Sequence, residues 1–270
     1  MIIDFHTHIF PEKVAKKALP KLSDVIHLAP SMNGTIEGLT ASMAEAGIDI
    51  SVVLPTVTDP HQFDSILRFA CFVNEYDYGE DGPRLLSLGG IHPDASDYKA
   101  QLLLMRDYGF PGFKIHPDYQ EACFDDIRYM RILDKATEMG LFCITHSGYD
   151  PYSPGKVHCT PEMVLHVMED VAPKNLVLAH MGSNGFYDKA ELMLMGLPLY
   201  LDTAYSIHNM DLEQFIRMCK AHGTGHILFG SDAPWTSQKE DVEIFQNISS
   251  FSSEEKEAIL ADNAKELLGI

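Results

Sequence analysis

Long apolar runs are missing from this sequence. A transmembrane helix needs about 20 consecutive, mainly apolar residues, and no stretch of the 270-residue chain offers them. The first residues also lack the basic region and the long apolar region of a secretory signal peptide, because Asp4, His6 and His8 follow Met1 almost at once. These absences exclude a membrane-spanning protein and predict a cytoplasmic one.

Basic residues are scarce as well. Twenty lysines and arginines stand against 39 aspartates and glutamates, which gives a formal net charge of −19. Because a field of this sign repels phosphate backbones, it excludes nucleic acid as a partner and leaves a small-molecule substrate. An anionic substrate would need local positive charge at its site. An acidic chain of this size is commonly a dimer or larger, and we expect a homo-oligomer.

Cysteines form no recognisable pattern. The five cysteines are widely scattered and odd in number, and no Cys-x-x-Cys pair occurs. This distribution excludes a disulfide scaffold and a cysteine-rich zinc module, and it is typical of reduced, structural thiols.

Short continuous apolar runs recur along the whole chain, and such runs are typical of strands buried on both faces of a parallel sheet. After the opening strand, which ends in the two histidines, we expect strands at 50–54, 85–91, 112–116, 141–145, 176–179, 199–201 and 227–231. Helical patterns fall at 12–19, 35–47, 61–76, 97–108, 125–139, from 160 onward, and at 239–248 and 253–268. No linker divides them. The sequence therefore predicts an α/β fold, one (β/α)₈ TIM barrel domain over 1–270 with extra C-terminal helices.

The opening strand carries the first candidate site. His6 and His8 are spaced i, i+2, so on a strand both side chains point to the same face. Two imidazoles at one strand end can bind the same divalent metal ion. The active sites of TIM barrels lie at the carboxyl ends of the strands, so the other strand ends decide whether this interpretation holds.

Histidine or aspartate follows several other strands. The residues at these ends are His92, Lys114, His116, His146, His180 and Asp232. His92 and His116 each precede a proline and could be turn residues. His146 and His180 end two successive apolar strands, which favours a shared ligand.

Lys114 and Asp232 each have two interpretations. Asp232 could cap the next helix, or it could bind a metal ion and take a proton from metal-bound water. Lys114 has the parity of His116 and points inward, so it needs an anionic partner or must become neutral. It could pair with a substrate carboxylate, or react with CO₂ to form a carbamate that bridges two metals.

The combined pattern resembles the metal site of the amidohydrolase superfamily, and the family-2 branch in particular. The matching positions are His6 and His8, His146, His180 and Asp232, within the segments 4–11 (DFHTHIFP) and 230–235 (GSDAPW). The resemblance covers nearly the whole chain. That branch includes metal-dependent hydrolases, hydratases, lactonases and non-oxidative decarboxylases of aromatic or unsaturated acids.

The resemblance implies a role for each residue. His6, His8, His146, His180 and Asp232 are metal-site residues, with zinc the most plausible ion and manganese the alternative. Segment 114–117 (KIHP) resembles the lysine segment of binuclear members, in which the lysine is carboxylated and joins the metal site. Many family-2 enzymes hold one metal and lack the carbamate, and there His180 acts as a catalytic acid or base. One or two ions therefore remain open.

Three functions follow in order of preference. The first is hydrolysis of an amide, lactone or ester by metal-activated water, with Asp232 as general base and His180 as the second catalytic residue. The second is metal-dependent non-oxidative decarboxylation. The third, a TatD-like nuclease suggested by segment 90–93, is disfavoured because that branch carries glutamate where this chain has Lys114. We expect the substrate to contact His116 and three residues of the long loop after the fifth strand, Tyr152, Lys156 and His158.

Overall fold

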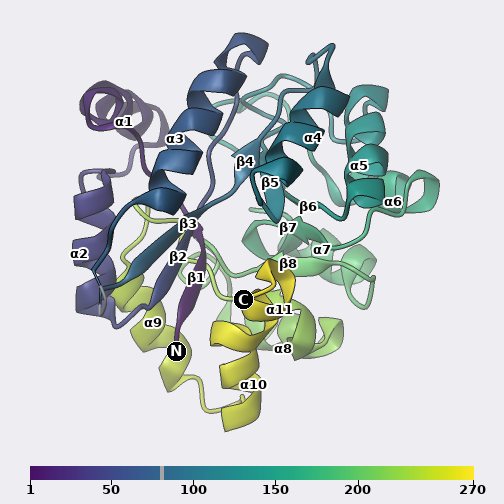
Figure 1. Cartoon of the computed structure of the whole chain (residues 1–270). Coiled ribbons are helices and arrows are strands. Elements are labelled where there is room, and N and C mark those ends of the chain that lie inside the picture. Colours follow the sequence, from purple (N-terminus) through teal and green to yellow (C-terminus); the bar gives the residue numbers. More distant parts are fainter. Residues whose placement is uncertain (80–81) are drawn as a thin grey trace.

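The computed structural model describes residues 1–79 and 82–270, in which parallel strands form a central ring inside a layer of helices (Figure 1). The strands are β1 (Ile3–Thr7), β2 (Ile50–Val53), β3 (Arg84–Ser87), β4 (Gly89–Gly90), β5 (Gly112–Ile115), β6 (Phe142–Thr145), β7 (Leu176–Leu178), β8 (Tyr200–Asp202) and β9 (Ile227–Leu228). Each is paired in parallel with its neighbours, in the orders β1-β2-β3 and β4-β5-β6-β7-β8-β9.

Backbone hydrogen bonds join these two sheets at both edges. Leu88 alone separates β3 from β4, and its N–H donates to the carbonyl of Val53 at 3.0 Å, so β3 and β4 form one barrel strand. At the other edge, the N–H of Phe5 donates to the carbonyl of Phe229 at 2.7 Å, and Thr7 bridges to Ala233 in parallel. The fold is the predicted TIM barrel.

The helices form the outer layer of the barrel. They are α1 (Glu12–Ile26), α2 (Ile36–Ala46), α3 (Phe63–Glu75), α4 (Tyr98–Asp107), α5 (Ile127–Met139), α6 (Pro161–Asp170), α7 (Tyr187–Leu194), α8 (Leu212–His222), α9 (Gln238–Asn247), α10 (Ser253–Glu257) and α11 (Asn263–Leu268). Within the described part of the chain, no helix has the length and apolar character needed to cross a bilayer.

Most element boundaries agree with those predicted from the sequence, and the main differences are in three elements. The first helix was expected to end at residue 19 but continues through Pro20 to Ile26. The expected helix at 253–268 is divided by a π-helical turn at 258–262. The last strand stops at Leu228 rather than 231, because the following residues turn to bond β1. Helices α7 and α8 were not predicted from the sequence.

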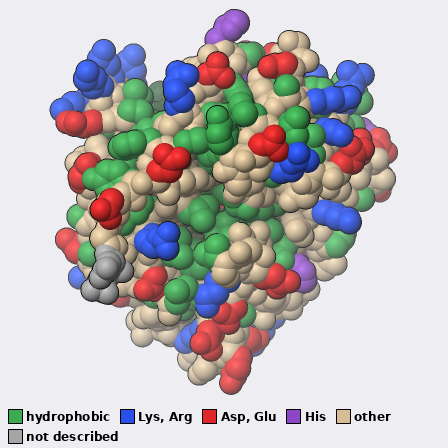
Figure 2. Space-filling view, in the orientation of Figure 1, with side chains coloured by type: hydrophobic (Ala, Val, Ile, Leu, Met, Phe, Trp, Pro, Cys, Tyr) green, Lys and Arg blue, Asp and Glu red, His purple; other side chains and the backbone are tan. Residues whose placement is uncertain are grey.

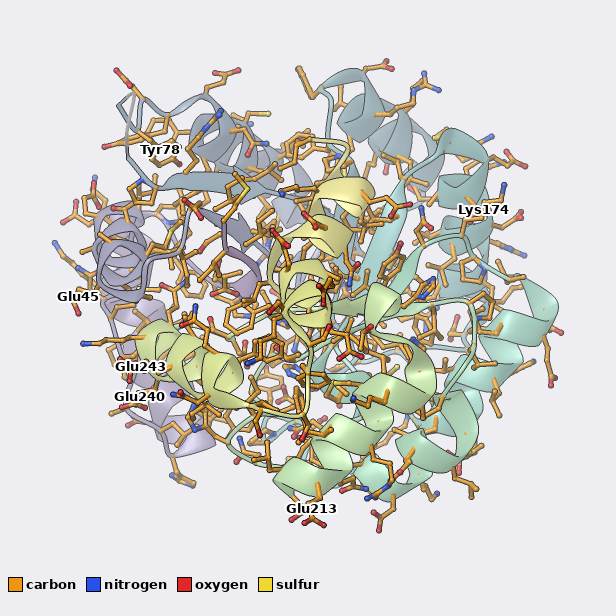
Figure 3. The ribbon with its side chains drawn as sticks, turned by 90° about the horizontal axis from the view of Figure 1, so that it is seen from below. Glu45, Tyr78, Lys174, Glu213, Glu240 and Glu243 are labelled. Atoms are coloured by element: carbon orange, nitrogen blue, oxygen red, sulfur yellow. The ribbon has the colours of Figure 1, made fainter. Side chains whose placement is uncertain are left out.

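The C-terminal helices close one end of the barrel. Ala261, Ala264, Leu267 and Leu268 pack in one buried cluster with side chains from the strands, including Ile3 and Phe5 of β1. Seen from below, the C-terminal segment lies across the middle of the barrel (Figure 3). Because this end is filled with apolar side chains, polar chemistry is confined to the opposite end, where the strands terminate.

Basic side chains gather near that open end. Helix α1 follows β1 directly and carries four lysines, Lys13, Lys16, Lys17 and Lys21, all of them exposed. Figure 2 shows basic side chains at the corner where Figure 1 places α1, and both basic and acidic side chains over the rest of the face. Helix α1 is therefore more basic than the chain as a whole.

A buried carboxylate in β1 connects this strand to the segment that follows the last strand. Asp4 is fully buried and accepts hydrogen bonds from the Ser231 hydroxyl at 2.6 Å, the Ser231 N–H at 2.9 Å and the Gln238 amide at 2.7 Å. These bonds fix the segment that carries Asp232.

We predict that Asp4→Ala lowers the free energy of unfolding by roughly 3 kcal/mol, because it leaves the buried donors of Ser231 and Gln238 unpaired. Urea denaturation of the purified protein measures this change. Asp107→Ala, which removes an exposed ion pair with Arg106, is the control and should cost less than about 1 kcal/mol. Equal effects of the two substitutions would contradict the assignment.

Candidate metal centre

Two histidines and an aspartate converge where β1 ends. His6 Nε2 lies 3.2 Å from His8 Nε2, and Asp232 Oδ1 lies 3.4 Å from the first and 3.1 Å from the second. The i, i+2 spacing on β1 places both imidazoles on one face, as predicted. Asp232 is held against them because its own N–H donates to the carbonyl of His6 at 2.8 Å.

The hydrogen-bond partners assign the protons of the two imidazoles. His6 Nδ1 lies 2.8 Å from the carboxylate of Asp202, and His8 Nδ1 lies 3.1 Å from the carbonyl of Leu54. Both partners only accept, so each Nδ1 carries the hydrogen and each Nε2 presents a lone pair. Three acceptor atoms thus face one another.

A divalent metal ion fits this trio. The closeness of the acceptors is unfavourable without a cation, and burial holds the pKa of His6 well below its ordinary value, so a proton on that ring does not relieve it. Zinc–ligand bonds of about 2.0–2.1 Å place tetrahedral ligands about 3.3 Å apart, close to the observed spacing.

His180 and Asp202 form the next layer of this cluster. The N–H of His180 donates to Asp202 Oδ1 at 2.8 Å, and His180 Nδ1 lies 2.9 Å from the carbonyl of Ala204. His180 Nε2 then faces His146 Nδ1 at 3.0 Å. His6, His180 and Asp202 form a second group whose ligand atoms could hold an ion. Asp202 was not among the site residues predicted from the sequence, although it ends a strand as the other candidates do.

The backbone at the site is strained. His180 and Asp232 have positive φ values of 58° and 77°, in the left-handed region that residues with a side chain rarely adopt. Such conformations persist only where surrounding contacts enforce them, and they are common at functional sites. Both residues that the resemblance names as catalytic have this conformation, which six other non-glycine residues of the described chain also adopt.

Lys114 lies deeper in the barrel. Its Nζ is buried, and no hydrogen-bond partner lies near it. Burial lowers the pKa of Lys114 to about 8, and attraction to Asp202 and Asp232 limits the shift. Among the described residues, it is the one buried lysine or arginine side chain. The inward direction predicted from its parity is confirmed.

His116 and His92 differ in their distance from this cluster. The His116 ring stacks on Tyr119 at 3.8 Å and on His146 at 4.3 Å between ring centroids. His92 Nδ1 instead accepts the N–H of Asp94 at 3.1 Å, the turn arrangement considered from the sequence. His116 therefore belongs to the wall of the site, and His92 does not.

The three residues of the loop at 147–160 that were predicted to contact the substrate differ in their surroundings. Tyr152 is half exposed and meets the edge of Tyr119 at 4.8 Å. The Lys156 side chain is exposed. His158 is buried with its Nδ1 2.9 Å from Asp118, and that pair anchors the loop. The structure thus brings Tyr152 near the aromatic wall but gives His158 a partner outside the metal centre.

We predict that His8→Ala weakens binding of Zn²⁺ and Mn²⁺ at least roughly 100-fold, because loss of an outer hydrogen-bond partner alone costs about 10–100-fold. Calorimetric titration of metal-free protein measures the affinity. His27→Ala removes an exposed histidine after α1 and should leave the affinity unchanged. Undiminished binding by His8→Ala would rule out the trio as the centre.

Lys114→Met should stabilise the metal-free protein. A lysine whose pKa is lowered on folding destabilises the fold fully below the folded pKa of about 8, and this penalty disappears as the pH rises towards the unfolded value of about 10.4. The gain is therefore roughly 3 kcal/mol at pH 7 and fades between pH 8 and pH 10. Urea denaturation at several pH values measures it. A loss of stability at pH 7 would show that Lys114 is paired or carboxylated.

Solved structures with the same fold cover almost all of this chain. A 2,6-dihydroxybenzoate decarboxylase from Rhizobium is 16% identical with a TM-score of 0.72 (99% of this chain, 98% of that chain). A TIM-barrel protein from Bordetella bronchiseptica is 18% identical with a TM-score of 0.75 (99% and 98%). A 5-carboxyvanillate decarboxylase from Novosphingobium aromaticivorans, complexed with manganese and 4-hydroxy-3-methoxy-5-nitrobenzoic acid, is 14% identical with a TM-score of 0.74 (100% and 96%).

At these identities the likeness establishes the fold alone. No curated protein has a sequence that matches this chain. The family model described as amidohydrolase matches residues 3–270, nearly the whole chain. With the histidines and aspartates gathered at the strand ends, this match shows that the protein belongs to the amidohydrolase family.

Proposed function

We propose that this protein is a metal-dependent, non-oxidative decarboxylase of an aromatic carboxylic acid. Two of the solved structures that share its fold are decarboxylases of such acids, and one of them contains manganese. This reaction was the second choice from the sequence. Within the site, the observation that carries it is the buried, unpartnered ammonium group of Lys114.

Lys114 supplies what an anionic substrate needs. An amide, ester or lactone is neutral and gains little from a buried cation, whereas a carboxylate is held by one. The whole chain has a net charge of −19, so an acid must find its positive charge locally. A divalent ion held by His6, His8 and Asp232 would supply the remaining charge and polarise the bound acid.

The wall beside Lys114 suits a flat ring. His116 lies parallel to Tyr119, with an angle of 7° between the ring planes, and Tyr152 meets Tyr119 at 69°. Aromatic side chains in such offset and edge arrangements favour a further aromatic ring. We therefore place the ring of the substrate against Tyr119 and Tyr152, with its carboxylate towards Lys114.

The reaction requires one proton and no water. The bond between the ring and the carboxylate breaks to release CO₂, and a proton takes its place on the ring carbon. His180 is fixed at its N–H by Asp202 and at its Nδ1 by Ala204, so its Nε2 is the atom that can hold and deliver this proton. Asp232 orients the cluster and is the second group able to exchange a proton there.

Hydrolysis stays a prediction, as does a carboxylated Lys114. The two predictions are linked, because a carbamate would turn the Lys114 cation into an anion. The positive charge that we propose to bind the substrate carboxylate would then be lost. The state of this one nitrogen therefore separates the two reactions. Zinc likewise stays a prediction, and manganese is the ion that we would supply first.

Isotope labelling distinguishes the reactions. We predict that manganese-loaded protein, incubated with hydroxybenzoic acids in D₂O, releases CO₂ and gives a product with one deuterium on the carbon that carried the carboxylate. Mass spectrometry of the product and of the gas measures both. Hydrolysis would instead insert ¹⁸O from labelled water into a new acid, and would contradict the proposal.

His180→Gln tests the proton donor in the same assay. Loss of a general acid lowers turnover by roughly 100-fold or more, with the manganese content of the protein retained. His61→Gln removes an exposed histidine of the 3₁₀ turn at Pro60–Gln62, just before α3, and is the control. Full activity of His180→Gln would overturn the assigned role.

A further inference from the structure

A third group of potential ligands lies beside the centre, and Asp150 is its acidic member. Asp150 Oδ2 is 3.5 Å from His116 Nε2 and 3.8 Å from His146 Nε2, and all three side chains are buried. Asp150 comes from the loop at 147–160, whereas both histidines stand at strand ends. Two roles are open to it: it could bind a second cation together with the histidines, or it could accept hydrogen bonds from them.

The tautomer of His116 decides against a second cation. The N–H of Tyr119 points at His116 Nδ1 at 3.4 Å, so Nδ1 accepts and the hydrogen of the ring lies on Nε2. A nitrogen that carries hydrogen cannot bind a metal. His116 Nε2 is therefore a donor directed at Asp150.

His146 has the complementary arrangement. Its Nδ1 faces the centre, 3.0 Å from His180 Nε2, which is itself a lone pair because His180 Nδ1 donates to Ala204. His146 Nε2 is buried and has no hydrogen-bond partner at its present distance from Asp150. If Nδ1 binds the ion, the hydrogen moves to Nε2 and points at Asp150.

The other histidines of the centre each have an acceptor for the hydrogen on the second ring nitrogen. Metal-binding imidazoles usually donate their second N–H to a carboxylate or carbonyl, which fixes the ring and its tautomer. Of the two imidazoles in the trio, His6 donates to Asp202 and His8 to the carbonyl of Leu54. His180, the proposed proton donor, is fixed in the same way by the carbonyl of Ala204. His146 would be the exception without Asp150.

We propose that Asp150 is the positioning residue that fixes His146 with Nδ1 towards the metal ion, so that the loop at 147–160 controls how tightly the ion is held. This inference rests on the proposed metal centre and not on the reaction. It assigns to Asp150 a contact with His146 and none with the substrate.

The anchoring of the loop supports this coupling. Asp118 accepts hydrogen bonds from the Ser153 hydroxyl and from His158 Nδ1, at the middle and the end of the loop. The N–H of Tyr152 donates to Asp150 Oδ1 at 2.7 Å. Because Asp118 bonds the loop at Ser153 and at His158, its loss should loosen the loop that carries Asp150.

Metal affinity tests the proposal directly. We expect Asp150→Asn to raise the Kd for Mn²⁺ about 10–100-fold in calorimetric titrations of metal-free protein, and Asp150→Glu to recover part of the loss. The matched control is Asp125→Asn, because Asp125 forms an exposed pair with His166 at 3.1 Å. An unchanged Kd for Asp150→Asn, or an equal rise for Asp125→Asn, would overturn the inference.

Two further measurements separate positioning from general damage. Asp118→Ala should raise the Kd several-fold while circular dichroism shows an intact fold, and an unchanged Kd would overturn the coupling through the loop. In ¹⁵N spectra of zinc-loaded protein, His146 should carry its hydrogen on Nε2; a hydrogen on Nδ1 would overturn its orientation. His146→Gln assigns the signal.

The outcome does not depend on the reaction. Manganese binding that needs Asp150, in a protein that releases no CO₂ from aromatic acids, would support this inference and overturn the proposed function. A wild-type protein that binds neither Mn²⁺ nor Zn²⁺ would overturn the inference itself.

Discussion

Two imidazole nitrogens and one carboxylate oxygen, none carrying hydrogen, face one another within 3.4 Å at the open end of this barrel. In a buried setting such an arrangement is unfavourable, so the rest of the structure must hold it in place. Asp202 and the Leu54 carbonyl fix the outer nitrogens of the rings, and the left-handed backbone at Asp232 directs its carboxylate inward. A divalent cation would be attracted by all three atoms. The fold therefore favours metal binding at this position even before a substrate is bound.

The sequence could predict much of this because barrel strands are short and buried on both faces. Continuous apolar runs mark such strands, and the residue after each run falls at the open end, so His6, His8, His146, His180 and Asp232 could be found from position alone. Asp202 follows the same rule but was not among the predicted site residues. The route of α1 through Pro20 and the short helix α7 depend on tertiary packing that local patterns do not encode.

The long loop shows where such prediction ends. Tyr152, Lys156 and His158 were selected because their chemistry suits a substrate, yet His158 is turned to Asp118 and the Lys156 side chain is exposed. Which way a loop side chain points depends on partners far away in the sequence. Asp150 illustrates the converse, because nothing in its neighbourhood of tyrosines and prolines marks it, and only the folded chain brings it to His116 and His146.

Chemistry at this centre is set less by the ligands than by the charge beside them. The same histidines and aspartate could serve hydrolysis or decarboxylation, since both begin with an ion that polarises an oxygen. The chemical state of Lys114 distinguishes the two reactions. As an ammonium group it balances the charge of a substrate carboxylate, and as a carbamate it would repel one. With its pKa lowered to about 8, the free amine is still mostly protonated at neutral pH. A buried cation without a hydrogen-bond partner is costly unless an anion joins it. Under the proposed function, that anion is the carboxylate to be removed.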